Sequence, residues 1–200
     1  LEGFYTRLNH VFVLEEIGKD EEHNAVIKER RNGQGAEVAG VTVEGKVAYL
    51  SLVQLQAGVT WQKSHYTRPE KWSKDSSVPA EKRIFRTPDW YGYFTATYSP
   101  VKPLNIALSG TYTGSMIVQH MKGYIPKDMA VTTPDFFDMN LKISYDFSLY
   151  KFITLQLNAG VQNIFNAYQR DFDQGKERDS GYIYGSSMPR SYFAGAKLMF

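Results

Sequence analysis

The side chains that most often carry out chemistry are sparse in this sequence and lack a catalytic arrangement. None of the 200 residues is a cysteine, which excludes a thiol nucleophile and a disulfide framework. The histidines, His10, His23, His65 and His120, lack the spacing of a metal site, although His65 and His120 fall at loop bases and could meet across adjacent strands. No Ser, His and Asp residues form a recognisable triad. We therefore expect no enzyme activity, no bound metal and no cofactor.

A cluster of carboxylates near the C-terminal end does not match a calcium-binding loop. Its acidic residues lack the required spacing and are interleaved with Arg170, Lys176 and Arg178. These acidic residues are Asp171, Asp173, Glu177 and Asp179. Opposite charges this close in sequence favour a solvated loop that compensates its own charge.

The best candidates for binding are aromatic and arginine side chains in two long polar segments, residues 65–83 and 167–188. Rings and guanidinium groups provide much of the binding energy at contact surfaces. Segments of this kind are loops that an external ligand would reach first. The candidate ligand contacts are Tyr66, Arg68, Trp72, Arg83, Arg170, Tyr182 and Tyr184.

The elements that must position these loops are β-strands, because apolar and polar residues alternate along most of the remaining chain. The alternation is clearest over residues 137–147 and 153–162. The pattern predicts eight strands, at residues 3–17, 37–49, 53–62, 84–99, 104–113, 137–147, 153–162 and 192–200. Two prolines at positions 100 and 103 predict a tight turn between the fourth and fifth strands.

The connections between these strands alternate in length. Long loops, residues 19–35, 65–83, 119–134 and 167–188, follow the odd-numbered strands, whereas short turns follow the even-numbered ones. This asymmetry is typical of outer-membrane β-barrels, which have short periplasmic turns and longer extracellular loops. An even number of strands would place both chain ends on the periplasmic side.

Aromatic residues fall at two levels of the predicted strands and would form the two girdles of a membrane barrel. The group near the short turns is Tyr49, Tyr98, Phe147, Phe152 and Phe200. The group toward the long loops is Trp61, Trp90, Tyr112, Phe137, Phe165 and Tyr192. The last strand also ends on an aromatic residue, and Tyr192, Leu198 and Phe200 share its apolar side.

Composition excludes several classes of protein and leaves one rival fold. A net charge of +2 is too balanced for a nucleic-acid-binding protein. The sequence contains no run of roughly 18 apolar residues, which excludes a transmembrane helix. A soluble sandwich or lipocalin-like barrel would also alternate, but its core would not accept lysine at 142 or 197.

The predicted inward face has few charges and otherwise short polar side chains, which favours the wall of a wide barrel over a filled small one. Its charged residues are Arg7, Glu44, Lys46, Asp138, Lys142, Asp146 and Lys197.

An ordered series of short motifs resembles the C-terminal part of TonB-dependent outer-membrane receptors. The motifs are Gly-Phe-Tyr-Thr-Arg at 3–7, Val-Thr-Val-Glu-Gly at 41–45, Arg-Thr-Pro at 86–88, Leu-Ser-Gly-Thr-Tyr-Thr-Gly at 108–114, Gly-Val-Gln-Asn-Ile-Phe-Asn at 160–166, and Pro-Arg-Ser at 189–191 leading to Phe200. In that family the next-to-last strand typically ends in Asn, an aliphatic residue, Phe, then Asp or Asn, which matches Asn163 to Asn166.

The resemblance implies an all-β, antiparallel transmembrane barrel of 22 strands, of which residues 1–200 would supply the last eight. This chain shows neither the family's N-terminal plug domain nor a signal peptide. The implied function is TonB-dependent uptake of a scarce nutrient, such as an iron-siderophore complex, haem or cobalamin, across the bacterial outer membrane. The alternative is a stand-alone eight-stranded barrel acting as an enzyme, adhesin or structural anchor.

The resemblance also implies the partners. They would be the plug and other strands of the same receptor, the TonB complex through the missing N-terminal part, outer-membrane lipid and the barrel assembly machinery. The terminal Phe200, with Tyr192 and Leu198, resembles the signal that this machinery recognises. Nucleic acid is not an expected partner.

Overall fold

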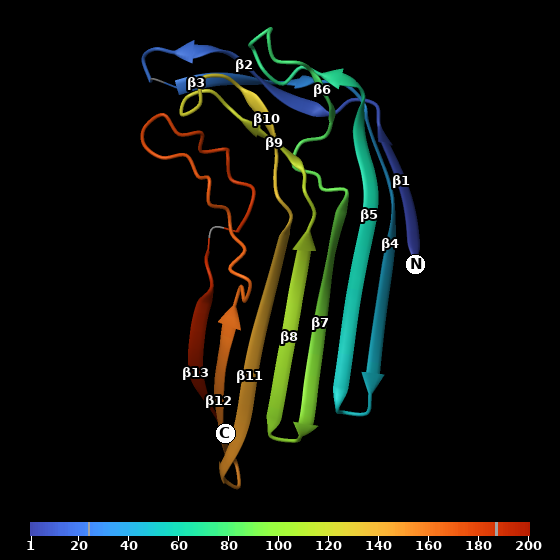
Figure 1. The fold of residues 1–200 in the computed structure, drawn as a ribbon, viewed down its shortest axis with the longest axis vertical. Coiled ribbons are helices and arrows are strands. Elements are labelled where there is room, and N and C mark those ends of the chain that lie inside the picture. Colours follow the sequence, from blue (N-terminus) through green and yellow to red (C-terminus); the bar gives the residue numbers. More distant parts are fainter. Residues whose placement is uncertain (24, 187) are drawn as a thin grey trace.

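The computed structural model describes residues 1–23, 25–186 and 188–200, and every regular element in these ranges is a β-strand (Figure 1). The described residues contain no helix of the length and apolarity needed to cross a membrane. The main sheet follows the order β1 (Glu2–Leu8), β4 (Ala36–Tyr49), β5 (Val53–Glu70), β7 (Trp90–Val101), β8 (Leu104–Thr113), β11 (Phe136–Tyr150), β12 (Ile153–Gln162) and β13 (Ser191–Met199). Neighbouring strands are antiparallel, and the short β6 (Glu81–Arg83) pairs with β5 off this path. The all-β, antiparallel fold is therefore confirmed.

The sheet is open, with β1 and β13 as its two edge strands. The longest strands, β4, β5 and β11, contain 14, 18 and 15 residues. A tilted strand needs roughly 9 to 11 residues to cross a bilayer, whereas strands of globular sheets usually have about 5 or 6. The strand lengths thus favour the membrane barrel over the soluble sandwich.

Strand register sorts the side chains into an apolar face and a polar face, because directly opposite residues in neighbouring strands point to the same side. One transverse row of the apolar face is Val47, Leu55, Ala96, Leu108, Leu141, Val161 and Tyr192. The adjacent row, on the polar face, is Ala48, Gln54, Thr97, Ala107, Lys142, Gly160 and Phe193. The predicted alternation is confirmed across the main sheet.

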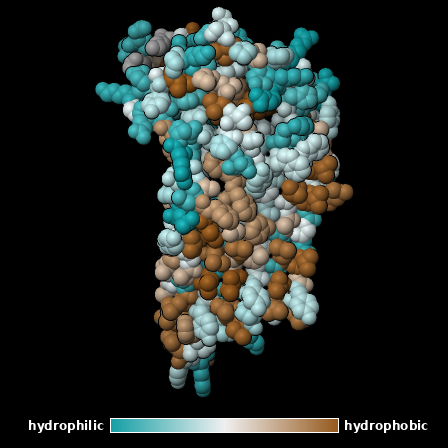
Figure 2. All heavy atoms as spheres, viewed as in Figure 1, coloured by the Kyte–Doolittle hydropathy of each residue, from teal (hydrophilic) through white to brown (hydrophobic). Residues whose placement is uncertain are grey.

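The short turns and the long loops lie at opposite ends of the strands (Figure 1). Residues 50–52, 102–103 and 151–152 connect the three tight hairpins, and the first of them places Leu50 at a φ of 52°. Figure 2 shows hydrophilic residues gathered over the long-loop end and hydrophobic residues over the strands below it. The predicted asymmetry of the connections is therefore confirmed.

The apolar face changes character toward the long loops. Trp61 and Trp90 lie opposite each other on β5 and β7, with ring centroids 6.3 Å apart. Beyond this pair the same face carries Arg7, Glu37 and His65. Side-chain nitrogens of Arg7 and His65 each lie 3.6 Å from the carboxylate of Glu37. The assignment of Arg7 to the polar, inward face was therefore wrong, since its register partner Glu37 shares the face of the apolar residues.

Two predicted loops contribute to separate two-stranded hairpins. The first predicted strand ends at Leu8, and the chain then forms a separate hairpin of β2 (Phe12–Asp20) and β3 (Ala25–Asn32) within the predicted strand and loop. A register shift between Glu16 and Gly18 interrupts the hairpin's alternation and hid it in the sequence. Similarly, β9 (Ile117–His120) pairs with β10 (Met129–Thr132) inside the predicted loop 119–134.

Two strand bounds also differ from the prediction. β5 continues to Glu70, well into the predicted loop 65–83. The fourth predicted strand begins at Trp90 instead of Ile84, because Pro88 has no backbone N–H to pair and Arg86 has a φ of 59°. The sequence pattern predicted both chain ends on the side of the short turns. The C-terminal strand does finish beside the short-turn end, whereas Glu2 pairs with Thr42, halfway along β4.

Candidate functional site

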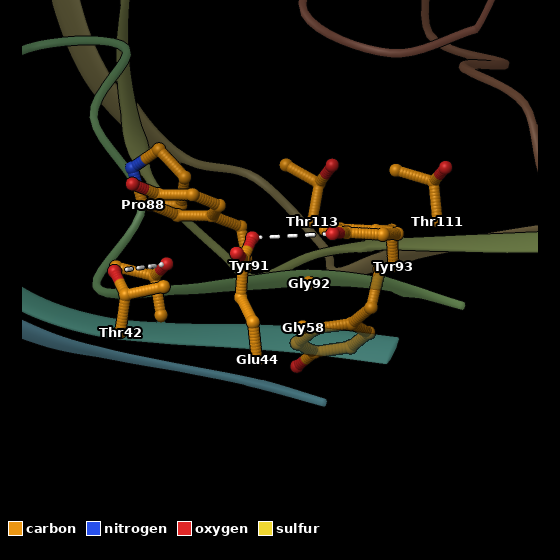
Figure 3. Close-up of a pocket in the computed structure, with 11 residues that line it drawn as sticks. Thr42, Glu44, Gly58, Pro88, Tyr91, Gly92, Tyr93, Thr111 and Thr113 are labelled. Atoms are coloured by element: carbon orange, nitrogen blue, oxygen red, sulfur yellow. Dashed lines mark hydrogen bonds between the residues drawn. The ribbon is translucent and has the colours of Figure 1, made fainter. Parts of the chain in front are cut away.

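The polar face offers a shallow pocket built around a tyrosine and a glutamate. The hydroxyl of Tyr93 on β7 donates a hydrogen bond of 3.1 Å to Glu44 on β4 (Figure 3). It also accepts one of 3.2 Å from the side-chain amide of Gln56 on β5. The Tyr93 ring lies over Gly58, where an added Cβ would approach the ring to 2.7 Å, so the intervening strand needs a glycine. The residues of this pocket are polar and aromatic, which suits binding of a polar partner.

Threonine hydroxyls and Tyr91 complete this pocket, whose volume is about 400 Å³. Thr42 and Thr60 share a hydrogen bond of 2.9 Å, and Thr111 and Thr113 line the opposite side (Figure 3). The pocket can therefore bind and orient a partner through hydroxyl, carboxylate and ring contacts.

The candidate ligand contacts of residues 65–83 lie on β5, β6 and the loop between them. Trp72 donates from its ring nitrogen to the carbonyl of Pro79, 3.1 Å away, and packs edge-on against Phe85. Arg83 is exposed and pairs with Glu81 at 3.1 Å. Tyr66 is half-buried and Arg68 is exposed on the last residues of β5. The structure gathers these side chains at the long-loop end of the sheet.

The candidates in residues 167–188 divide into an exposed residue and two packed ones. Arg170 is exposed, and its guanidinium lies 5.0 Å from the centre of the Tyr168 ring. Tyr182 is 4% exposed and stacks parallel to the ring of His120 at 3.7 Å. The Tyr184 ring is half-buried, 6.0 Å from the ring of Phe136. The two tyrosines thus hold the loop together in this structure.

A carboxylate fixes both tyrosines. The hydroxyl of Tyr182 donates to one oxygen of Asp171 at 2.8 Å, and that of Tyr184 donates to the other at 2.6 Å. Burial and the hydrogen bond to Asp171 raise the pKa of Tyr182 to about 12, and the same causes raise the pKa of Tyr184. Burial of Asp171 opposes its ionisation, but the two phenol hydrogen bonds outweigh it and lower the pKa of Asp171. The three groups form a phenol–carboxylate clasp of neutral tyrosines on an ionised aspartate.

Further contacts tie this loop to its neighbours. His120, on β9, pairs with the buried carboxylate of Asp173 at 2.9 Å. The carboxylate of Asp179 accepts the backbone N–H of Met121 at 2.8 Å. The guanidinium of Arg86 donates to the backbone carbonyls of Gly181 and Ile183. These contacts hold three segments together: the loop, the β9–β10 hairpin and the segment before β7.

His65 and His120 have separate carboxylate partners instead of meeting each other. His65 lies 3.6 Å from Glu37, whereas His120 contacts Asp173. Among the residues that the structure describes, no three His, Asp or Glu side chains are grouped to hold a metal ion.

Asn163 is a structural residue whose role the sequence motif did not reveal. It has a φ of 52°, it is 5% exposed, and its backbone N–H donates to the side chain of Asn140. Its side chain accepts from the N–H of Ala167 and donates to the carbonyls of Ala167 and Met188, at 2.8 to 3.0 Å. Asparagine adopts positive φ more readily than most residues, so an asparagine just after the end of a predicted strand was the available signal.

Asn166 extends the same turn. It also has a positive φ, of 54°, and its side-chain oxygen accepts the N–H of Arg190 just before β13. The end of β12 is therefore bound to the start of β13 across the whole loop. Sequence reasoning missed the roles of Arg86 and Gln169 and assigned Asp171 to a solvated loop. All three act through contacts with distant backbone or side chains that no local pattern displays.

The residues of the predicted assembly signal lie on the apolar side of the last strand. Tyr192 faces Val161 and Leu198 faces Leu155 across the β12–β13 pair, and both are exposed. Phe200 follows the end of β13 and is 91% exposed. The three side chains are thus accessible along the edge strand.

Comparison with known proteins gives a family and two similar folds. The family model described as TonB-dependent receptor-like, β-barrel, matches residues 1–164. The ferric-catecholate import receptor Fiu from E. coli has a TM-score of 0.58 and 20% identity over 98% of this chain. The ferric enterobactin receptor PfeA from Pseudomonas aeruginosa, crystallised as a mutant, has a TM-score of 0.53 and 16% identity over 98% of this chain.

The chain spans only about a quarter of these receptors, 24% of the first and 28% of the second. At these identities the likeness shows a shared fold. No curated protein sequence matches the chain significantly.

Proposed function

The chain belongs to the TonB-dependent receptor-like β-barrel family, and we propose that it is the C-terminal part of an outer-membrane receptor that imports a ferric siderophore. Residues 1–200 would supply the last eight of 22 barrel strands. The family consists of transporters and receptors of the bacterial outer membrane, so the proposal involves no catalytic step.

The observation that carries this proposal is the two-faced sheet beneath a large loop cap. An apolar face that ends in a Trp pair and then in charged residues has the layering of a surface that passes from hydrocarbon to headgroups. The opposite face carries hydroxyls, amides and carboxylates, which suit a wet interior. A wall of this kind separates lipid from a polar passage.

The names of the two similar receptors support the choice of ligand. Fiu is a ferric-catecholate import receptor and PfeA is a ferric enterobactin receptor, so both names concern a ferric complex. The loop end of this chain adds exposed cations, Arg68, Arg83 and Arg170. Cationic and aromatic side chains are suited to bind an anionic aromatic complex.

We assign different tasks to the candidate loop residues. Arg68, Arg83 and Arg170 would contact the ligand directly, and the half-buried Tyr66 and Trp72 would line their approach. Tyr182 and Tyr184 would act by holding the loop in shape through Asp171. The plug and the TonB complex would act through the rest of the receptor.

Growth of a strain lacking the full-length gene tests the proposal. Iron-limited cultures would receive one iron source each, a ferric catecholate, a ferric hydroxamate or haem, with a separate cobalamin-dependent assay. We expect growth to fail on the ferric catecholate alone and to return with the full-length gene, but not in a strain without TonB. Normal growth of the deletion strain on every source would overturn the proposal. A defect confined to haem or to cobalamin would show that the receptor imports that nutrient instead of a ferric siderophore.

The loop assignment has its own test. Arg170→Ala in the full-length receptor should weaken ferric-catecholate binding roughly tenfold, a loss of about 1.4 kcal/mol that only a minority of contact residues reach. Lys151→Ala removes an exposed cation from the opposite, short-turn end and is the matched control. Equal affinities of the two variants would remove Arg170 from the binding surface.

A further inference from the structure

The apolar face of the sheet has a notch at the middle of its height. Five of the residues that line it also border the pocket of the polar face, namely Glu44, Gly58, Gly92, Tyr93 and Tyr112. The volume of the notch is about 570 Å³, and it extends over β4, β5, β7, β8 and β11. Small residues form its floor at Gly45, Ala57 and Gly92. Larger apolar side chains form its walls, namely Val43, Val47, Leu55, Val59, Phe94, Tyr112 and Phe137.

Register places the notch between the two aromatic levels of the face. Gly45 lies four residues along β4 from Val41, which pairs with Trp61, and four residues from Tyr49, which pairs with Val53 at the other level. The row through Gly45 is apolar throughout, with Ala57, Phe94, Gly110 and Met139 in line. The notch is thus a gap within the apolar band.

The shape of the notch comes from how one ring packs. The Phe94 ring lies over Gly110, where an added Cβ would come within 2.2 Å of it, and is 6.4 Å from the Phe137 ring. By contrast, a Cβ built on Gly45 would meet nothing within 4 Å. The ring therefore turns toward β8 and β11 and leaves the space above Gly45 and Ala57 empty.

We propose that this notch is a fixed binding site for one acyl chain of an outer-membrane lipid. The inference rests on the membrane placement given under the proposed function. In a bilayer the notch opens onto hydrocarbon, and most of its lining is apolar. Glu44 and Tyr93, which also border it, belong by register to the polar face. Its volume falls in the range of roughly 300 to 1,000 Å³ that is typical of ligand pockets.

A second copy of the chain fits the notch less well than a lipid does. Five strands spaced by about 4.8 Å make the notch about 20 Å wide, and it is only three residue rows high. Stable protein interfaces bury about 800 Å² on each partner, which is more than this area offers. A single acyl chain, lying across the strands, needs no such area.

Lipid retention by the purified full-length receptor tests the site. The receptor would be extracted from outer membranes, washed in mild detergent and weighed by native mass spectrometry. Gly45→Leu places a side chain in the empty space without a steric clash, so the variant should fold normally and lose a bound lipid that the wild type keeps. Ala57→Leu fills the notch from the neighbouring strand and should have the same effect.

Gly3→Leu is the matched control, because Gly3 lies on the same face, has equally open space and is outside the notch. It should retain lipid as the wild type does. Equal lipid retention by the wild type, Gly45→Leu and Ala57→Leu would overturn the inference, as would a wild-type dimer that Gly45→Leu abolishes. Failure of the proposed function is a separate result, since it would be seen as normal growth of the deletion strain.

Discussion

At the residue scale, the phenol–carboxylate clasp gives the loop cap a defined pH range. The folded-state pKa of Tyr182, about 12, is above its ordinary value of 10.0, so the stabilisation is complete below pH 10.0 and is lost as the pH rises through about 12. The pKa of Asp171 is below its ordinary value of 3.8, so its contribution is present above that pH and is lost as the pH falls through the folded-state value. The clasp is therefore intact across the neutral range.

Asp171→Asn should shift the tyrosine titration. Removing the negative charge brings the pKa of Tyr182 closer to its ordinary value, so a difference titration of tyrosinate absorbance should show earlier ionisation in the variant. Limited proteolysis should then cut the loop at a lower alkaline pH than in the wild type. Asp75→Asn, in a different loop, is the control, and identical titrations of Asp171→Asn and the wild type would contradict the assigned cause.

Asn163 is the second residue whose replacement has a clear expected cost. Asn163→Ala leaves polar groups of Ala167 and Met188 without their partners, which costs about 1 to 3 kcal/mol. The positive φ adds about 1 kcal/mol for an alanine. Urea unfolding of the full-length receptor in detergent, followed by gel mobility, measures the loss. Asn32→Ala, at an exposed position of β3, should be close to neutral, and similar midpoints for both variants would exclude the structural role.

At the scale of the strand, the two faces should respond differently to the same charge. Leu157 lies in the middle of β12, opposite Tyr145 and Ala196 on the apolar face. Gln156 lies on the polar face and donates a hydrogen bond to Asp146. Leu157→Arg should cost about 2 to 4 kcal/mol in a lipid-facing position, whereas Gln156→Arg should be mild because it gains a carboxylate neighbour. Refolding yield into lipid vesicles compares them, and equal tolerance would reverse the facing assignment.

How far the sequence could predict these elements depends on the range of the contacts that shape them. The alternation of apolar and polar residues along a strand is visible within a few residues. The eight strands of the main sheet were therefore predictable from apolar residues such as Leu141 and Ile143. The β2–β3 hairpin was missed because its register shifts at Glu16, and β9–β10 because four-residue strands show too short a pattern. The site was less predictable, because Tyr182 and Asp171 are neighbours only through the folded loop.

At the scale of the whole molecule, the open sheet sets what residues 1–200 can do without a partner. The edge strands β1 and β13 present unpaired backbone groups, and each such group costs several kcal/mol in hydrocarbon. The polypeptide of residues 1–200, refolded into detergent, should therefore form mixed aggregates. Size-exclusion chromatography and conductance measurements check this, and a detergent-stable closed pore would support the stand-alone barrel instead.

Arg86 connects two loops through backbone groups, so the contact does not depend on the side chains of the residues it binds. Its guanidinium binds the carbonyls of Gly181 and Ile183, which every amino acid supplies. Asp179 similarly holds a backbone N–H, that of Met121. Substitutions at positions 121 and 183 therefore leave these ties in place. The side chains of these loops can therefore vary while the hydrogen bonds that set the loop shape are kept.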